Sequence, residues 1–550
     1  MTELVQELSE QPLPPGPSEY AGLFRWPEEF WRGLHGLLPA EILESNVRNH
    51  GQIYMTSHFS GVGTAEMALA MIQSFFRRSG IWPGESSQSS DSDAPAPTPV
   101  VFHSSCDSDK ICQDVLKAHH SVSRCQHLFG DVCSAAPGHV VKLLEDKLRS
   151  LQSKFLAQSF SSNEDKIQER VALEKRMHAF AVKLLDSEPM NNACHCLVHG
   201  RQCNLFPTAE STDHRMLFHI EVAGSPCIAF VRGGAYGTAL RWLHEVTVPF
   251  YIWLFSVKKA KPAMIVHECV PGFDVNVVDA GLNSQGLRYH VQSLVFSPEE
   301  EGVPIKRQRR YTLGLRSDLC PPLLKFDAST WRCVAFAERV ATAEMYFQAS
   351  KELLSVWKKT LARRRALPDR PTFAKQDEDW CWQALLTSTE RLLVNEIRNE
   401  NLKEIADIEA QMKSLDPFDP ERQEYENTIA GKHRWLVNVS QSKGFQPKCS
   451  NHRLLIMPAL LRSAKFFIDG ENVSESRLVH PLELMAMQSL PALLPQTLQD
   501  LHGLNFESVL SAANVHAQNL TGLAGNGMHV SSVGKTLMFG LAVIMSDCTV

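Results

Sequence analysis

The sequence predicts an α/β protein with a mostly parallel central sheet and helices on both faces. Short apolar runs rich in β-branched and aromatic residues alternate with segments of helical period, and such alternation is typical of a parallel sheet. Several of these runs end in glycines or acidic residues, at the sheet edge where parallel strands place ligand-binding groups. The chain has 550 residues, 44% of them hydrophobic, which suffices for a large core.

The strands are predicted from apolar runs that end at turn or acidic residues. After the first strand, apolar residues recur every three or four positions between 65 and 76, which predicts a helix directly behind a glycine turn. A long pattern rich in Lys, Glu, Leu and Gln over 138–186 also indicates helix, and residues 333–415 are mostly helical in pattern. The predicted strands are 51–59, 100–106, 127–131, 215–222 and 262–269, with a possible return to strands in 452–468.

Charge and cysteine content limit the classes of function. The net charge of −6 gives no global basic field, so any surface for nucleic acid has to be local. The 14 cysteines are scattered, and the start of the chain is acidic and proline-rich, so we expect a reducing intracellular compartment. No apolar run reaches the roughly 18 residues that a membrane span needs, so no membrane partner is expected.

A strand, a glycine turn and a helix meet at FSGVG, residues 59–63. Backbone N–H groups at such a turn can approach a ligand closely. Asp107 and Asp131 stand at the tips of the next two strands, where carboxylates can accept ribose hydroxyls and an adenine amino group. This order predicts an adenosine cofactor, and Glu66 in place of a third glycine favours S-adenosylmethionine over NAD. The alternative is that both acids are ordinary strand caps.

A thiol, a carboxylic acid and two guanidinium groups follow later strands. Cys227 comes after Pro226 at a strand-to-loop exit, before the glycine-rich loop 231–237, and could be packed, bind metal or act as a nucleophile. Glu268 lies near the end of the next strand. Arg307 and Arg309 are two residues apart and hence on one side of an extended segment. A thiol, a carboxylic acid and guanidinium groups together are suited to catalysis rather than to metal binding.

The motifs FSGVG, DSD, GDV, SPC, HEC and VPIKRQRR occur in the order of those in the cytosine-5 DNA methyltransferases, and the chain resembles that family. RLVHPLELMAMQSLP and LAGNGMHVSSVGKTL resemble the last two family motifs, so that the likeness covers about 59–131, 214–315 and 477–545. It implies a Rossmann-like, S-adenosylmethionine-dependent fold and methylation of carbon 5 of a flipped-out cytosine in DNA. The alternatives are the same reaction on RNA, as in the tRNA-modifying branch, and a catalytically silent nucleic-acid-binding protein.

The resemblance also implies a role for each site residue. Cys227 would add to carbon 6 of cytosine as a thiolate, and a protonated Glu268 would donate to ring nitrogen 3. Arg309, with Arg307 as a second candidate, would hold the base carbonyl and a phosphate. The residues implied to bind S-adenosylmethionine are Phe59, Ser60, Gly61, Gly63, Asp107, Asp131, Pro226 and Asn526.

Five positions depart from the family pattern and remove hydrogen-bonding side chains from the neighbourhood of the site. The groups with direct chemical roles remain, so we expect turnover with an altered placement of the substrate. The departures are Ile228, Cys269, Ile305, Leu482 and Gly527, where the family usually has Gln, Asn, Gln, Arg and Ser.

Two further clusters have both a functional and a structural interpretation. The three cysteines and two histidines of ACHCLVHGRQC, residues 193–203, could hold zinc, but their spacing is not the Cys-x-x-Cys of common fingers, so we expect no metal and a reduced loop. KKTLARRR, residues 358–365, indicates phosphate contacts or a nuclear import signal, or else a solvated helix end. A nuclear location is the resulting expectation. The zinc candidates are Cys194, Cys196, His199 and Cys203.

These features divide the chain into six segments. Residues 84–99 are a polar linker within the second of them. The segments are a partly disordered N-terminal extension with one short helix (1–50), a cofactor-binding half (51–132), a helical insertion (133–213), a catalytic half (214–315), a helix-rich recognition region (316–476) and a C-terminal return to the first domain (477–550).

Overall fold

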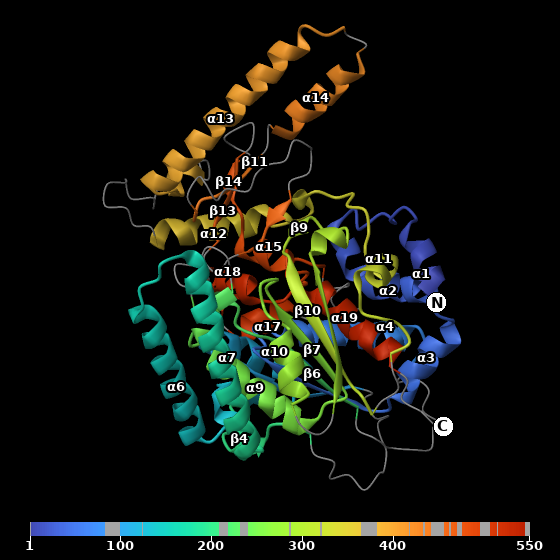
Figure 1. Ribbon diagram of the computed structural model, residues 1–550. Helices are drawn as coiled ribbons and strands as arrows, with labels where there is room; N and C mark the ends of the chain where they lie inside the picture. Colours follow the sequence, from blue (N-terminus) through green and yellow to red (C-terminus); the bar gives the residue numbers. More distant parts are fainter. Residues whose placement is uncertain are drawn as a thin grey trace.

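Seven strands form the central sheet of the computed structural model, in the order β3-β2-β1-β6-β7-β10-β8 (Figure 1). The strands are β1 (Ile53–His58), β2 (Val100–Cys106), β3 (His127–Phe129), β6 (Phe218–Gly224), β7 (Met264–Cys269), β8 (Tyr289–Phe296) and β10 (Arg309–Arg316). The structure describes residues 2–82, 100–123, 125–207, 218–230, 240–284, 288–318, 322–364, 382–416, 419–432, 435–441, 456–460, 464–469, 476–495, 506–513 and 515–544.

The sheet is parallel except at β10. Strand β1 pairs in parallel with β2 on one side and with β6 on the other, whereas β10 runs antiparallel between β7 and β8. The chain order therefore reverses at β1. In open α/β sheets such a reversal marks the crevice where ligands bind, outside the carboxyl ends of the strands, which here are β1 and β6. The predicted α/β class is confirmed, and five strands lie where the sequence predicts them.

Helices cover both faces of the sheet, each over its own hydrophobic core (Figure 1). Alternate residues of β7 serve the two cores, with Met264 and Val266 in one and Ile265 in the other, as the two-residue period of a strand requires. One face carries α2 (Trp26–His35), α3 (Ala40–Asn49), α4 (Thr64–Arg78), α5 (Lys110–Ser123) and α19 (Val530–Val543). The other carries α6 (Gly138–Ala157), α7 (Asn163–Ser187), α9 (Thr247–Ala260) and α10 (Asn276–Leu282).

The segment between β3 and β6 contains two long helices and not one. Buried residues of α6 recur at three- or four-residue steps from Val140 to Phe155, and they pack against a matching stripe on α7. Ser162 begins α7 as its N-cap by accepting a hydrogen bond from the Asp165 N–H, at 3.0 Å. A small hairpin follows, formed by β4 (Ala193–His195) and β5 (Gln202–Asn204).

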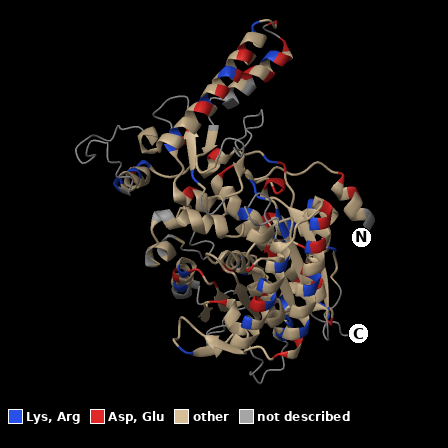
Figure 2. Ribbon diagram, turned by 60° about the vertical axis from the view of Figure 1, so that its left-hand side comes forward, with Lys and Arg blue, Asp and Glu red and all other residues tan. Residues whose placement is uncertain are grey.

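A smaller unit with its own core lies at one end of the molecule (Figure 1). Its three-stranded sheet packs against α13, which in turn contacts α14. Basic and acidic residues are mixed along both helices, as is typical of solvated helices (Figure 2). Its elements are α12 (Lys351–Arg364), α13 (Ser388–Met412), α14 (Pro420–Lys432), β11 (Trp435–Asn438), β13 (Phe466–Asp469) and β14 (Arg477–Leu478). Five further elements contribute to the core of the main sheet instead: β9 (Ile305–Lys306), β12 (Met457–Pro458), α15 (Pro481–Ala486), α17 (Phe506–Ala512) and α18 (Ala517–Asn526).

The N-terminal segment differs from the expectation of partial disorder. Helix α1 (Thr2–Ser9) packs against α11 (Ala328–Val334), and Arg332 Nε donates to the Ser9 carbonyl at 2.6 Å. The one short helix expected within 24–47 is two helices, α2 and α3, whose apolar faces join the core. In the described chain, no helix combines the length and the apolar character that crossing a bilayer requires.

Trp331 on α11 is fully buried among aromatic rings from several elements, including Phe30 and Phe539. Trp331→Ala is expected to lower the free energy of unfolding by about 3–5 kcal/mol, because the cavity cannot close around a rigid cluster. Trp331→Phe should cost less, because the buried indole N–H finds no hydrogen-bond acceptor among the described residues. Urea denaturation measures both; Val356→Ala, at a 64% exposed position, is the control, and equal midpoints for all three would contradict the prediction.

Candidate active site

The carboxyl ends of β1, β6 and β7 lie side by side. Gly224 ends β6 in register with Glu268 on β7. A Cβ added to Gly224 would lie 3.3 Å from Met528 Sδ and 3.7 Å from the Phe59 carbonyl oxygen. The first strand, the middle of the sheet and the C-terminal segment therefore meet at this edge.

Cys227 leaves β6 three residues after Gly224 and is half-buried. Its carbonyl accepts from the Phe230 N–H at 2.9 Å, which closes the short turn Ile228–Phe230. Burial raises the pKa of the Cys227 thiol; the positive charges of Arg309 and Arg307 oppose this, while Glu268 adds to it. The thiol thus lies within the electrostatic reach of all three groups, two of which favour the thiolate. The glycine-rich loop 231–237 lies outside the described residues.

Glu268 forms the centre of the charged cluster and is almost fully buried. Its Oε1 lies 3.0 Å from Arg309 Nε and 3.9 Å from Arg307 Nη2. The guanidinium groups come from opposite ends of the short segment between β9 and β10 and converge on one carboxylate. The thiol, acid and arginine pair singled out from the sequence therefore come together at one place.

Arg307 is 97% buried and connects the cluster to the C-terminal segment. Its Nη2 donates to the Gly527 carbonyl at 2.7 Å, and its backbone N–H donates to Ser297 Oγ at 3.0 Å. Burial, reinforced by the charge of Arg309 and opposed by that of Glu268, lowers the pKa of Arg307 to about 10. Its Nε and Nη1 find no hydrogen-bond acceptor among the described residues, so two buried donors are left for a ligand.

The FSGVG turn has the conformation that its glycines allow. Phe59, Gly61 and Gly63 have φ of +53°, +58° and +78°. The Gly61 N–H donates to Asp107 Oδ2 at 2.8 Å, and a Cβ on Gly61 would lie 3.9 Å from the Asn526 carbonyl oxygen. Six of the eight residues implied to bind the cofactor therefore cluster at this turn, and Pro226 lies on the adjoining exit from β6; the six are Phe59, Ser60, Gly61, Gly63, Asp107 and Asn526.

Ser60 and Asp131 have internal partners that the resemblance does not suggest. Ser60 Oγ accepts from the Cys106 N–H at 3.0 Å and bonds Ser57 Oγ at 2.6 Å, which ties β1 to β2. Asp131 Oδ1 accepts from the Cys133 N–H at 2.9 Å and caps the turn Val132–Ala135, as the strand-cap alternative predicts for this oxygen. A carboxylate keeps further lone pairs, so a cap can also accept from a ligand.

A buried polar network beneath the crevice escaped the sequence analysis. Glu221 Oε1 accepts from Trp253 Nε1 at 2.9 Å and lies 2.7 Å from His58 Nδ1. Glu66 accepts from Ser105 Oγ at 2.5 Å, and burial raises its pKa, which hydrogen bonding opposes. The sequence does contain an indication of this network, because polar residues interrupt the apolar strands. Glu66, at the third-glycine position, joins β1 to β2 by accepting from Ser57 and Ser105.

The positions that depart from the family pattern lie in different surroundings. Ile228, next to the thiol, is 58% exposed, whereas Cys269 and Ile305 are buried and Leu482 packs partly against the core. Gly527 supplies the carbonyl that Arg307 binds. An apolar side chain thus stands in solvent beside Cys227.

Three of the four zinc candidates come together, with one partner that the sequence analysis missed. His127, Cys196, His199 and Cys203 place their donor atoms within 4.8 Å of one another. Cys194 is not in this group, because its Sγ donates to the Ser134 carbonyl at 3.4 Å.

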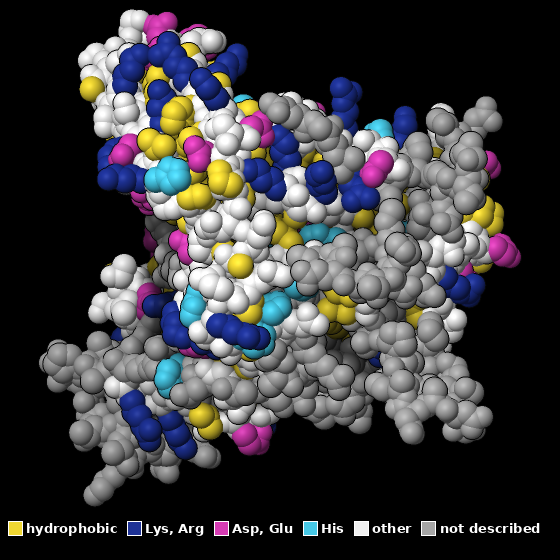
Figure 3. Space-filling view, turned by 90° about the horizontal axis from the view of Figure 1, so that it is seen from below, with side chains coloured by type: hydrophobic (Ala, Val, Ile, Leu, Met, Phe, Trp, Pro, Cys, Tyr) yellow, Lys and Arg dark blue, Asp and Glu magenta, His cyan; other side chains and the backbone are white. Residues whose placement is uncertain are grey.

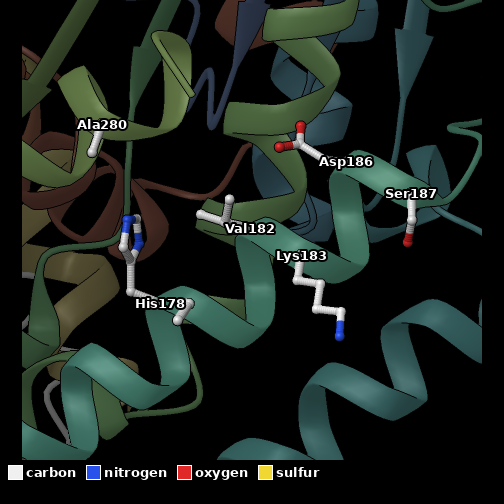
Figure 4. Close-up of a pocket in the computed structure, with 7 residues that line it drawn as sticks. His178, Val182, Lys183, Asp186, Ser187 and Ala280 are labelled. Atoms are coloured by element: carbon white, nitrogen blue, oxygen red, sulfur yellow. The ribbon is translucent and has the colours of Figure 1, made fainter. Parts of the chain in front are cut away.

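A surface pocket lies between α7 and α10 and contains none of the predicted site residues (Figure 4). Its acid, Asp186, is paired with Lys258 Nζ at 2.7 Å. The pocket is lined by His178, Ala179, Val182, Lys183, Asp186, Ser187 and Ala280. On the face seen in Figure 3, the coloured Lys and Arg side chains are more prominent than Asp and Glu, and several of them gather at its upper left.

No family model and no curated protein matches the chain. Several solved methyltransferase structures are similar to it. EhMeth of Entamoeba histolytica has a TM-score of 0.38 and 10% identity, covering 89% of this chain and 98% of that one. A DNMT2 mutant of Spodoptera frugiperda has a TM-score of 0.37 and 11% identity, and the match covers 89% of this chain and 99% of that one. Dnmt2 of S. pombe has a TM-score of 0.38 and 11% identity, and the match covers 88% of this chain and 97% of that one.

Proposed function

We propose that this chain transfers a methyl group from S-adenosylmethionine to carbon 5 of cytosine in DNA, through a covalent adduct with Cys227. The observation that carries the proposal is the convergence of Cys227, Glu268 and Arg309 on one edge of the sheet, beside the FSGVG turn. A nucleophile, an acid and a fixed cation are the groups that addition to an electron-poor ring requires.

The cofactor side of the crevice fits an adenosine group. The turn at Gly61 carries no side chain, and Asp107 lies against it with a carboxylate that can accept ribose hydroxyls. Asn526 borders the same turn from the C-terminal segment. When bound there, S-adenosylmethionine supplies an electrophilic methyl group.

The protein groups divide the chemistry between them. Cys227 Sγ forms a bond to carbon 6, and the electron pair of the 5,6 double bond becomes available at carbon 5. Glu268, in its protonated form, donates to ring nitrogen 3 as negative charge builds on the ring, and Arg309 holds the base carbonyl. After methylation, loss of the carbon 5 proton to a base and expulsion of the thiolate restore the ring. The base has to leave the duplex to reach these groups, so flipping is part of the proposal.

Target recognition is proposed for the unit that contains α12–α14 and its three-stranded sheet. Lys358, in the basic segment 358–365, lies 5.7 Å from the centre of the Trp382 ring. Its neighbours on α12 offer charges for phosphate contact, and the same segment is the ground for a proposed nuclear location.

Incubation of the full chain with radiolabelled S-adenosylmethionine and three nucleic acids tests the proposal. Label is expected in carbon 5 of cytosine in duplex or hemimethylated DNA. Label in tRNA alone would move the reaction to RNA. Cofactor binding measured by calorimetry with no label in any nucleic acid would overturn the enzyme in favour of a silent binding protein.

Arg309→Ala is expected to raise the pKa of Cys227 further, because it removes the largest influence that opposes burial. Fewer thiolates then exist at neutral pH, so the alkylation rate of Cys227 by iodoacetamide should fall about tenfold per pKa unit gained, and its pH profile should move to higher pH. Peptide mass spectrometry measures the rate. Arg309→Lys keeps the charge and is expected to restore most of the profile; identical profiles for Arg309→Ala and the unaltered chain would refute this.

A further inference from the structure

We propose that His127, Cys196, His199 and Cys203 bind one zinc ion that joins a hairpin to the edge of the central sheet. His127 is the first residue of β3, the edge strand, and Cys203 lies on β5. Cys196 and His199 belong to the turn between β4 and β5. This site is separate from the proposed methyl transfer and does not depend on it.

The separations of the donor atoms match a tetrahedral zinc site. His127 Nδ1 and His199 Nδ1 are 3.3 Å apart, and Cys196 Sγ lies 3.5 Å from His199 Nδ1 and 3.9 Å from His127 Nδ1. Cys203 Sγ lies 3.5 Å from His199 Nδ1. Zinc bonds of about 2.0–2.1 Å to nitrogen and about 2.3 Å to sulfur, at tetrahedral angles, place two nitrogens about 3.3 Å apart and nitrogen and sulfur about 3.6 Å apart.

The donor set is the one that zinc uses in closed structural sites. Two thiolates and two imidazoles fill four positions and leave none for a substrate or catalytic water. Cys196 is fully buried, so this sulfur is shielded from solvent. Soft sulfur ligands together with imidazole favour zinc over the hard cations magnesium and calcium.

The backbone holds the turn in a geometry suited to this purpose. The Cys196 N–H donates to the Arg201 carbonyl at 2.8 Å, and the Gly200 N–H donates to the Cys196 carbonyl at 2.9 Å. Gly200 has a φ of +64°, which lets the turn close tightly. The Leu197 N–H donates to the Leu128 carbonyl at 2.7 Å, so the turn is already docked on β3.

The hairpin is short and depends on contacts outside its own two strands. Its strands have three residues each, and a two-stranded hairpin of that size is marginal in water. A metal ion shared with β3 would link the end of the α6–α7 segment to the sheet edge. That link explains why four ligand-type side chains, one of them 69 residues before Cys196, gather there.

Cys194 provides an internal comparison. It is buried and pairs in register with Cys203 across the hairpin, yet its sulfur donates to the Ser134 carbonyl. Loss of the Cys194 thiol therefore perturbs the same hairpin without removing a ligand. His195 is exposed on the same strand and is not one of the four proposed ligands, so its substitution is the corresponding control for the two histidine ligands.

The test is the metal content of the purified full chain, measured by plasma mass spectrometry, with cobalt(II) substitution as the second readout. The unaltered chain, Cys194→Ser and His195→Asn are expected to hold about one zinc per chain. Cys203→Ser and His127→Asn are expected to lose it. The chain stripped with a chelator should take up cobalt(II) with the strong visible bands of a tetrahedral site and a thiolate charge-transfer band, and the band should weaken in Cys203→Ser.

Results that overturn the site are equally clear. One is a reduced, folded chain that holds no stoichiometric metal and gives no thiolate–cobalt band. Another is an equal metal content in Cys203→Ser and Cys194→Ser. The third is a thiol count showing that Cys196 and Cys203 form a disulfide. If Cys203→Ser fails to fold, chelation of the unaltered chain replaces it, with reversible loss of the metal and a fall in Tm that zinc restores as the supporting outcome.

Discussion

Cys227→Ser is expected to reduce methyl transfer by at least about a thousandfold, because a hydroxyl is a far weaker nucleophile than a thiolate toward carbon 6. Binding of S-adenosylmethionine should be unchanged, since the turn at Gly61 does not involve the thiol. A duplex with 5-fluorocytosine, from which no carbon 5 proton can be lost, should trap the unaltered chain as an adduct stable in denaturing gels. The measurements are initial rates with labelled cofactor and the yield of adduct.

The control for this substitution is Cys333→Ser, another partly buried thiol, which lies on α11 outside the charged cluster. It should keep both turnover and trapping. Equal adduct yields from Cys227→Ser and the unaltered chain would remove Cys227 as the nucleophile.

Glu268→Gln is expected to lower kcat by about a hundred- to a thousandfold, within the range for loss of a positioned acid. The amide cannot pass a proton to ring nitrogen 3, and it leaves the Arg309 guanidinium without its ion-pair partner. Affinity for S-adenosylmethionine should remain, which separates this effect from misfolding. Single-turnover rates and calorimetry measure the two quantities.

Glu299→Gln is the matched control, because it also removes a carboxylate from an ion pair with an arginine, but the pair, with Arg339, does not include Glu268, Arg307 or Arg309. Wild-type kcat in Glu268→Gln would show that the carboxyl does not act on the base.

The sheet was predictable where hydrophobic runs end at turn residues, and less so elsewhere. The five strands β1, β2, β3, β6 and β7 follow this rule. Strands β8 and β10 were not predicted, because they are defined by antiparallel pairing across a connection and not by a local signal. The N-terminal helix α1 was missed because its order comes from docking on α11, a contact far away in sequence.

The candidate site was predictable in its residue types and not in its internal bonding. Local motifs located Cys227, Glu268 and both arginines. Nothing in the sequence shows that Ser60 is occupied in tying two strands together, since that depends on the Cys106 backbone. His127 was missed as a metal-ligand candidate because ligand spacing is visible only within one short segment, and it comes from another.

The hydrogen bond from Arg307 to the Gly527 carbonyl has a consequence for synthesis of the protein. The bond joins the middle of the chain to its C-terminal segment, 220 residues further on, so almost the whole polypeptide has to be synthesised before this site is complete. Nascent or prematurely terminated chains would contain Cys227 without the C-terminal part of the proposed site. Two separately expressed pieces, divided between these groups, should each be inert and regain activity only on reassociation.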